Sequence, residues 1–224
     1  MQPHESEHLM KFLQKFIFLA VGLMFLIVIQ STASANETEF LNTLKQLEKN
    51  GVIPWSEGKV TSYGSFTDSY TNMGAAKFYS ITEADHYVLS SKISWLSASP
   101  TPNSAVSGCG FTFSTGSNSN DYLATTIRMN GYIYFNGFKN GNKLSYGQQY
   151  IMTPSMQGEG LLTLVVNNSS VCIYFNGEQL FTRNDVVISG DKLGFTVLSG
   201  TNKDYGTQCT FEDIFLYTWQ DQTQ

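Results

Sequence analysis

Residues 161–181 read LLTLVVNNSSVCIYFNGEQLF, and this stretch decides the fold that the sequence predicts. Every second residue is apolar in both halves, namely Leu162, Leu164 and Val166 in the first and Val171, Ile173 and Phe175 in the second. Such alternation is typical of strands that place one face on a core. The polar segment 167–170 and the pair Asn176-Gly177 favour tight turns. We therefore expect antiparallel strands here.

The same alternation recurs through most of the chain. It predicts about ten short strands with turns between them and no crossover helices, at residues 78–81, 86–96, 107–114, 122–128, 132–138, 161–166, 171–175, 180–182, 192–198 and 207–219. Residues 38–50 are the one soluble segment with helical spacing of apolar side chains. This pattern predicts an all-β fold, a two-sheet antiparallel sandwich with one short N-terminal helix.

The last predicted strand contains an irregularity. Phe211 and Ile214 both resemble core residues, although they are three positions apart. A β-bulge at Glu212-Asp213 would turn both side chains inward, because an extra residue resets the alternation.

The N-terminus has the pattern of an export signal. Lys11 and Lys15 precede an apolar run at residues 16–29, and Ala33-Ser34-Ala35 fits the rule for signal peptidase cleavage. The run has about 14 residues, whereas a membrane span needs about 20; an uncleaved anchor is the alternative. We expect a signal peptide at 1–35, a helix and linker at 36–59, the sandwich at 60–219 and a tail at 220–224.

Composition narrows the class of partner. The 224-residue chain has a net charge of −5, and its Lys and Arg form no cluster. Nucleic acid is therefore not expected, because phosphate binding needs a concentrated basic surface.

The three cysteines can be sorted by the faces of their strands. Cys109 shares its face with Phe111, and Cys209 shares its face with Phe211, whereas Cys172 points the other way. In an oxidising compartment, Cys109 and Cys209 are the preferred disulfide pair. Three free thiols remain the alternative.

Five side chains on the outward positions of predicted strands suggest a binding surface: Tyr122, Arg128, Tyr132, Tyr134 and Tyr174. Flat aromatic rings suit the faces of sugars, and an exposed aromatic cluster often marks a ligand site. The alternative is structural, since tyrosine is also common on the solvent faces of sheets.

The sequence offers little for catalysis or metal binding. A glycosidase needs two carboxylates on either side of the scissile bond; Glu83-Ala84-Asp85 falls in a turn, and Glu212-Asp213 are adjacent. His86 is the single histidine after the export segment, and Asp121, Asp204 and Asp213 are candidate calcium ligands only by residue type. The sequence thus predicts no catalytic residue, no metal site and no cofactor.

Several spaced motifs resemble a known family. They are Ser65-Phe66-Thr67-Asp68, Gly110-Phe111-Thr112-Phe113, Asn120-Asp121-Tyr122-Leu123, Leu162-Thr163-Leu164-Val165-Val166, Ile173-Tyr174-Phe175-Asn176-Gly177, Lys192-Leu193-Gly194-Phe195 and Phe211-Glu212-Asp213-Ile214. Together they resemble the concanavalin A-like lectin/glucanase sandwich, and more narrowly the laminin-G-like and keto-disaccharide-hydrolase-like domains of exported bacterial proteins. The resemblance implies a jelly roll of two curved sheets whose concave face often receives carbohydrate. Fold alone does not choose between lectin, glycosidase and adhesion module.

These observations predict a secreted or cell-surface, non-catalytic sandwich that binds a glycan or a surface protein. One alternative is a glycoside hydrolase on the same fold. Another is a structural or adhesion module whose helix at 38–50 docks a partner. Contact with a membrane is expected only if the signal segment stays uncleaved.

Overall fold

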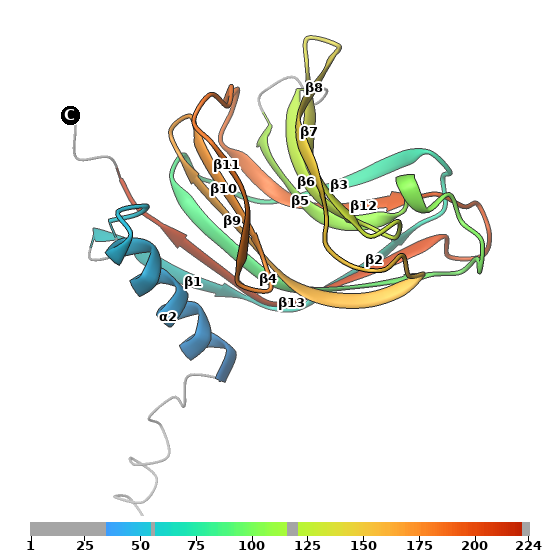
Figure 1. Ribbon diagram of the computed structural model, residues 1–224, viewed down its shortest axis with the longest axis horizontal. Coiled ribbons are helices and arrows are strands. Elements are labelled where there is room, and N and C mark those ends of the chain that lie inside the picture. The colour runs from blue at the N-terminus through green and yellow to red at the C-terminus, as the bar shows by residue number, and fades with distance from the viewer. Residues whose placement is uncertain (1–34, 55–56, 116–120, 221–224) are drawn as a thin grey trace, which may run out of the picture. The chain divides into compact units, whose positions relative to one another are not determined.

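Two antiparallel sheets packed face to face, with a helix against one of them, form the protein (Figure 1). The computed structural model describes residues 35–54, 57–115 and 121–220. Both sheets belong to one unit, Glu39–Gln224. The predicted all-β two-sheet sandwich with one N-terminal helix is therefore confirmed.

The first sheet, sheet A, has seven strands within the described residues. In spatial order they are β1 (Lys59–Tyr63), β13 (Thr207–Thr218), β4 (Tyr87–Ser97), β9 (Gln157–Asn167), β10 (Ser170–Phe175) and β11 (Glu178–Arg183), while β2 (Phe66–Tyr70) also pairs with β13. The predicted hairpin at 161–175 is β9–β10, with Leu164 opposite Ile173. Asn176 and Gly177 form the next turn with φ of 50° and 80°, which glycine adopts at little cost.

The second sheet, sheet B, has six strands within the same described ranges. Their order is β3 (Ala75–Glu83), β12 (Lys192–Ser199), β5 (Gly108–Thr115), β6 (Tyr122–Arg128), β7 (Tyr132–Lys139) and β8 (Asn142–Tyr150), and a short 3₁₀ helix, η2 (Ser104–Val106), precedes β5. The strands β1, β2 and β8 were not predicted. Their sequences are KVTSY, FTDSY and NKLSYGQQY, which are largely polar and carry no clear apolar alternation.

The core lies between the two sheets and is rich in aromatic rings. Phe195 of sheet B stacks on Phe211 of sheet A with 4.4 Å between ring centroids, and Phe66 of β2 lies 5.7 Å from Phe195. Phe113 and Leu164 are also fully buried. These contacts join the sheets because each strand sends alternate side chains inward.

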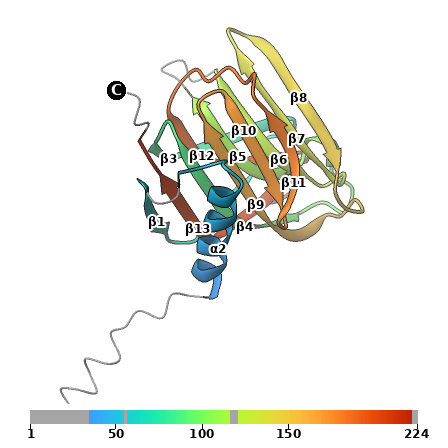
Figure 2. The same cartoon turned by 60° about the vertical axis from the view of Figure 1, so that its left-hand side comes forward.

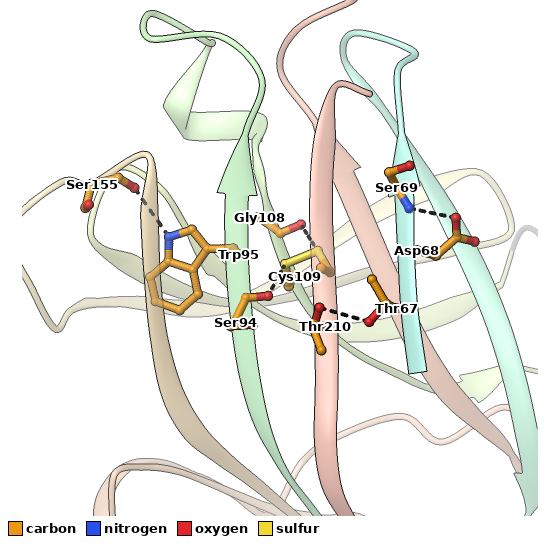
Figure 3. The surroundings of a disulfide bond; sticks show 10 residues. Thr67, Asp68, Ser69, Ser94, Trp95, Gly108, Cys109, Ser155 and Thr210 are labelled. Atoms are coloured by element: carbon orange, nitrogen blue, oxygen red, sulfur yellow. Dashed lines mark hydrogen bonds between the residues drawn. A yellow bond between two sulfur atoms is a disulfide. The ribbon is translucent and has the colours of Figure 1, made fainter. Parts of the chain in front are cut away.

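A disulfide crosses this core. Cys109 of β5 and Cys209 of β13 are bonded, with 5.9 Å between their Cα atoms and a sequence separation of 100 (Figure 3). Both side chains are fully buried. The pairing predicted from strand faces is thus present, and it links sheet A to sheet B.

The bulge predicted in the last strand is also present. The register of β13 against β4 shifts between Glu212 and Phe215, and Asp213 has a φ of 50°. Phe211 and Ile214 are both buried in the inter-sheet core as a result.

The helix α2 (Ala35–Lys49) covers the outer face of sheet A from Phe40 onward (Figure 2). Its buried side chains Phe40, Leu44 and Leu47 form a second core with Val165 and Phe215, and the Phe40 and Phe215 rings stack at 5.2 Å. Cys172, the unpaired cysteine, is buried in the same cluster. The apolar residues whose spacing predicted a helix therefore include the residues that pack against sheet A.

Tyr217 makes the stability of this second core sensitive to pH. Its hydroxyl donates to the carbonyl of Pro54 at 2.5 Å, and burial, with Glu48 and Glu57 adding to the effect, raises the pKa of Tyr217 to about 12. A raised tyrosine pKa means that the folded state favours the neutral phenol, so this contribution is complete below pH 10 and is lost as pH rises toward 12.

We therefore expect the stability advantage of the wild type over Tyr217→Phe to shrink between pH 10 and pH 12. Urea unfolding of both proteins from pH 8 to pH 12 measures it. Tyr87, Tyr122 and Tyr174 also have raised pKa values. Because these three tyrosines are present in both proteins, their contributions to the free energy of unfolding cancel when the two proteins are compared. A constant difference across this range would contradict the assignment.

The predicted export signal at residues 1–35 lies almost entirely outside the described residues. Among the helices that are described, none combines the length and the apolar character needed to cross a membrane.

Candidate functional site

A groove of about 510 Å³ lies on the face of sheet B that is turned away from sheet A. Residues from β3, β12, β6, β7 and β8 line it, together with residues before β3 and before β5; they are Gly74, Ala75, Ala76, Phe78, Val106, Tyr122, Ala124, Thr126, Arg128, Asn136, Phe138, Lys143, Thr196 and Leu198. The opposite side chains of these strands, such as Leu123, Ile127 and Phe195, are in the core. The groove is thus lined by outward-facing residues of the same strands whose inward-facing residues form the core.

The floor of the groove consists of small residues. Across the middle of the sheet, Thr196 of β12 lies opposite Gly110 of β5, and Gly110 lies opposite Thr126 of β6. Ala124 follows at the next outward position of β6. Small side chains here leave the space that larger ones would fill.

Aromatic rings meet over one end of this floor. Phe78 of β3 and Tyr122 of β6 have ring centroids 4.6 Å apart, and Phe138 of β7 lies 5.6 Å from Tyr122. Two strands, β12 and β5, separate β3 from β6, and three strand spacings amount to about 14 Å in a flat sheet. Sheet B is curved (Figure 1), and the contact between the rings of Phe78 and Tyr122 therefore requires that their side chains reach toward each other across the strands between them. Phe78 and Phe138 are still 43% and 38% exposed.

Arg128 occupies the other end of the groove. Its Nη1 donates to the carbonyl of Ala105 at 2.5 Å, its Nε donates to Oγ1 of Thr126 at 3.0 Å, and its guanidinium lies 4.7 Å from the ring centre of Tyr134. Burial lowers the pKa of Arg128, and the nearby Tyr134 and Tyr122 partly oppose that shift. The guanidinium nevertheless stays charged at neutral pH.

Further tyrosines extend the surface beyond Arg128. Tyr134 accepts a hydrogen bond from Nδ2 of Asn130 at 2.9 Å. Tyr132 lies 6.2 Å from Tyr134 and 5.3 Å from Tyr150 between ring centres, and Tyr150 is 54% exposed. The groove therefore continues into an aromatic surface over β7 and β8.

The structure places four of the five side chains predicted as a binding surface on sheet B and the fifth on sheet A. Tyr122 and Arg128 line the groove, Tyr134 contacts Arg128, and Tyr132 lies next to Tyr134. Tyr174 is not part of this surface, because β10 belongs to sheet A. Its ring packs against the helix cluster, and its hydroxyl donates to Oε1 of Gln179 at 2.8 Å. Alternation shows that a side chain points outward but not from which sheet.

Sequence reasoning missed four important lining residues: Phe78, Asn136, Phe138 and Lys143. Asn136 and Phe138 continue the outward series of Tyr132 and Tyr134, so extending that alternation would have found them. Lys143 lies on β8, a strand whose sequence gives no clear signal. To place Phe78 in the groove one must know that β3 pairs with β12, and a local sequence pattern does not reveal that pairing.

The carboxylates considered for catalysis lie elsewhere. The prediction that Glu83-Ala84-Asp85 falls in a turn is wrong for Glu83, which is the last residue of strand β3. Glu212 and Asp213 are on β13 of sheet A, and none of Glu83, Asp85, Glu212 and Asp213 lines the groove. Glu159, and to a smaller extent Glu212 and Asp213, raise the pKa of Lys92 on that sheet. Within the described residues, no group of three or more His, Cys, Asp or Glu side chains is arranged to hold a metal ion.

Comparison with known proteins supports the fold. No protein-family profile matches the chain, and no curated protein matches it. Among solved structures, the carbohydrate-binding module CBM66 from Bacillus subtilis is similar with a TM-score of 0.52 and 11% identity, over 69% of this chain and 92% of that one. The galectin LEC-6 from Caenorhabditis elegans has a TM-score of 0.43 and 17% identity, over 67% and 95%.

The narrower resemblance to laminin-G-like and keto-disaccharide-hydrolase-like domains stays a prediction. The order of strands, the two stacked sheets and the similarity to a solved module agree at the level of fold. The chain has the concanavalin A-like lectin/glucanase sandwich fold.

Proposed function

We propose that the protein binds carbohydrate in the groove of sheet B. The observation that carries the proposal is the combination of partly exposed rings, Phe78, Tyr122 and Phe138, with polar groups along the same small-residue floor. Binding sites for small ligands are typically concave and largely apolar, with a few placed polar groups that fix orientation.

The chemistry of sugars matches this arrangement. One face of a sugar ring is rich in C–H groups and stacks on an aromatic ring, while its hydroxyls need donors and acceptors. Phe138 and Tyr122 supply rings, and Asn136 lies on the same strand as Phe138, one outward position away. Strand β6 runs the length of the groove from Tyr122 to Arg128, about 20 Å at the usual rise per residue. This length suits a short oligosaccharide.

Two further observations support the proposal. The similar Bacillus subtilis protein is described as a carbohydrate-binding module. The buried Cys109–Cys209 disulfide is typical of proteins in oxidising compartments, where extracellular glycans are found. An exported, cell-surface or secreted protein is consistent with both.

Phe138→Ala tests the site. We expect it to weaken glycan affinity about 10-fold, because an aromatic stacking contact contributes up to about 1.5 kcal/mol in addition to the buried area. Ligands would first be identified on a glycan array with the full chain, and the affinities then measured by isothermal titration calorimetry.

Tyr205→Ala is the matched control. Tyr205 is 37% exposed, close to the 38% of Phe138, but it does not line the groove. Its removal should leave affinity unchanged. Equal losses in both variants, or no loss in either, would rule out this groove as the binding site.

A further inference from the structure

The charged side chains that line the groove are both cationic. Arg128 lies at one end, Lys143 of β8 lies beside Phe138 toward the other, and none of the described lining residues is Asp or Glu. The chain as a whole carries a net charge of −5. The groove therefore differs in charge from the molecule that contains it.

Arg128 has donors available for a ligand. A guanidinium has five N–H donors, and the described contacts use Nη1 toward Ala105 and Nε toward Thr126. Among the described residues, no carboxylate forms an ion pair with it. A cation that is partly removed from water without a counter-charge is costly, and an anion that binds there relieves that cost.

The nearest carboxylate along the chain is already engaged. Asp121 immediately precedes Tyr122, is 9% exposed and accepts a hydrogen bond from the backbone N–H of Asn140 at 2.8 Å. The side chain of Asp121 thus holds the β7–β8 hairpin and does not line the groove. The groove keeps its positive character.

We propose that the ligand is an anionic oligosaccharide, whose carboxylate or sulfate group binds Arg128 and whose further negative charge lies near Lys143. This inference rests on the proposed carbohydrate function and names the class of sugar. The planar fork of Arg128 matches a carboxylate or sulfate oxygen pair, and Lys143 acts as a flexible point charge. The rings between them contact the uncharged parts of the saccharide.

Matched pairs of ligands test the charge. Oligogalacturonate is compared with its methyl ester, and dextran sulfate is compared with dextran, by titration calorimetry on the full chain. We expect the charged member of at least one pair to bind 10- to 100-fold more tightly than its neutral counterpart, roughly the range for charge-assisted hydrogen bonds. The first pair reports carboxylate recognition, and the second reports sulfate recognition.

Variants assign the preference to the groove. Arg128→Gln and Lys143→Gln should each reduce the preference for the charged ligand, and Arg128→Lys should restore only part of it because the fork is lost. Lys49→Gln removes an exposed cation on α2 and should change nothing. Lys143 is itself exposed, so its variant keeps the test valid even if Arg128→Gln folds poorly.

The outcomes separate the two proposals. Equal affinity for charged and neutral ligands, with Phe138→Ala still weakening both, overturns the anionic class and leaves the carbohydrate site. A charge preference that Lys49→Gln removes as strongly as Arg128→Gln is nonspecific attraction and also overturns the inference. Failure of every charged and neutral glycan to bind overturns the carbohydrate function itself.

Discussion

Replacing Cys109 and Cys209 together by alanine is expected to lower the free energy of unfolding by about 4–5 kcal/mol. The bond closes a loop with a sequence separation of 100 residues, so its loss frees a large part of the unfolded chain. It also joins β5 of one sheet to β13 of the other. Urea unfolding of both proteins at neutral pH measures the change.

Cys172→Ala is the control for removing a thiol. Cys172 is buried under α2 and lies outside the disulfide, so its loss should cost about 1 kcal/mol at most. Because both bonded sulfurs are fully buried, dithiothreitol alone should leave the bond intact, whereas dithiothreitol with urea should break it. A double variant as stable as Cys172→Ala would show that the two sheets hold together without the bond.

Much of the fold could be predicted because local pattern and burial coincide in this chain. The alternation of Leu164, Ile173 and Phe175 was enough to place them in the core, where all three are buried. The bulge at Glu212-Asp213 followed from two core residues with the wrong spacing. Strands β1, β2 and β8 could not be found, because they pair along sheet edges or outside the main path, and their side chains are mostly half-exposed.

The candidate site was predicted only in part, for a different physical reason. Tyr122 and Arg128 could be placed outward from the alternation within their own strand. Phe78 and Lys143 enter the groove through pairing between strands, which a local pattern does not contain. Tyr174 was assigned to the same face because the sequence does not state which sheet a strand joins. Local pattern gives the direction of a side chain, whereas tertiary pairing gives its neighbours.

Two glycines of sheet B, Gly110 and Gly194, are expected to be important for stability. A Cβ on Gly194 of β12 would overlap the carbonyl oxygen of Tyr79 on β3, and a Cβ on Gly110 would overlap that of Thr125 on β6. Glycine at these two positions lets neighbouring strands approach closely, and we infer that this permits the curvature that brings Phe78 to Tyr122.

We therefore expect Gly110→Ala and Gly194→Ala each to lower the free energy of unfolding by about 1–3 kcal/mol, because the strands must move apart to accept a methyl group. The double variant should lose about 2–6 kcal/mol, since the two overlaps involve different strands. Urea unfolding measures the stability of each variant. Glycan titration calorimetry, under conditions in which the variants stay folded, measures their glycan affinity and so reports whether the groove is intact.

Gly64→Ala provides the matched control for these substitutions. A Cβ on Gly64 would have no other atom within 4 Å, and the φ of Gly64 is not positive, so alanine there should leave stability unchanged or raise it by up to about 1 kcal/mol. If the double variant lost no more stability than Gly64→Ala, the strands could accept the methyl groups without moving. The close approach at Gly110 and Gly194 would then not be what shapes the groove, and the contact between Phe78 and Tyr122 would have to arise from the side chains alone.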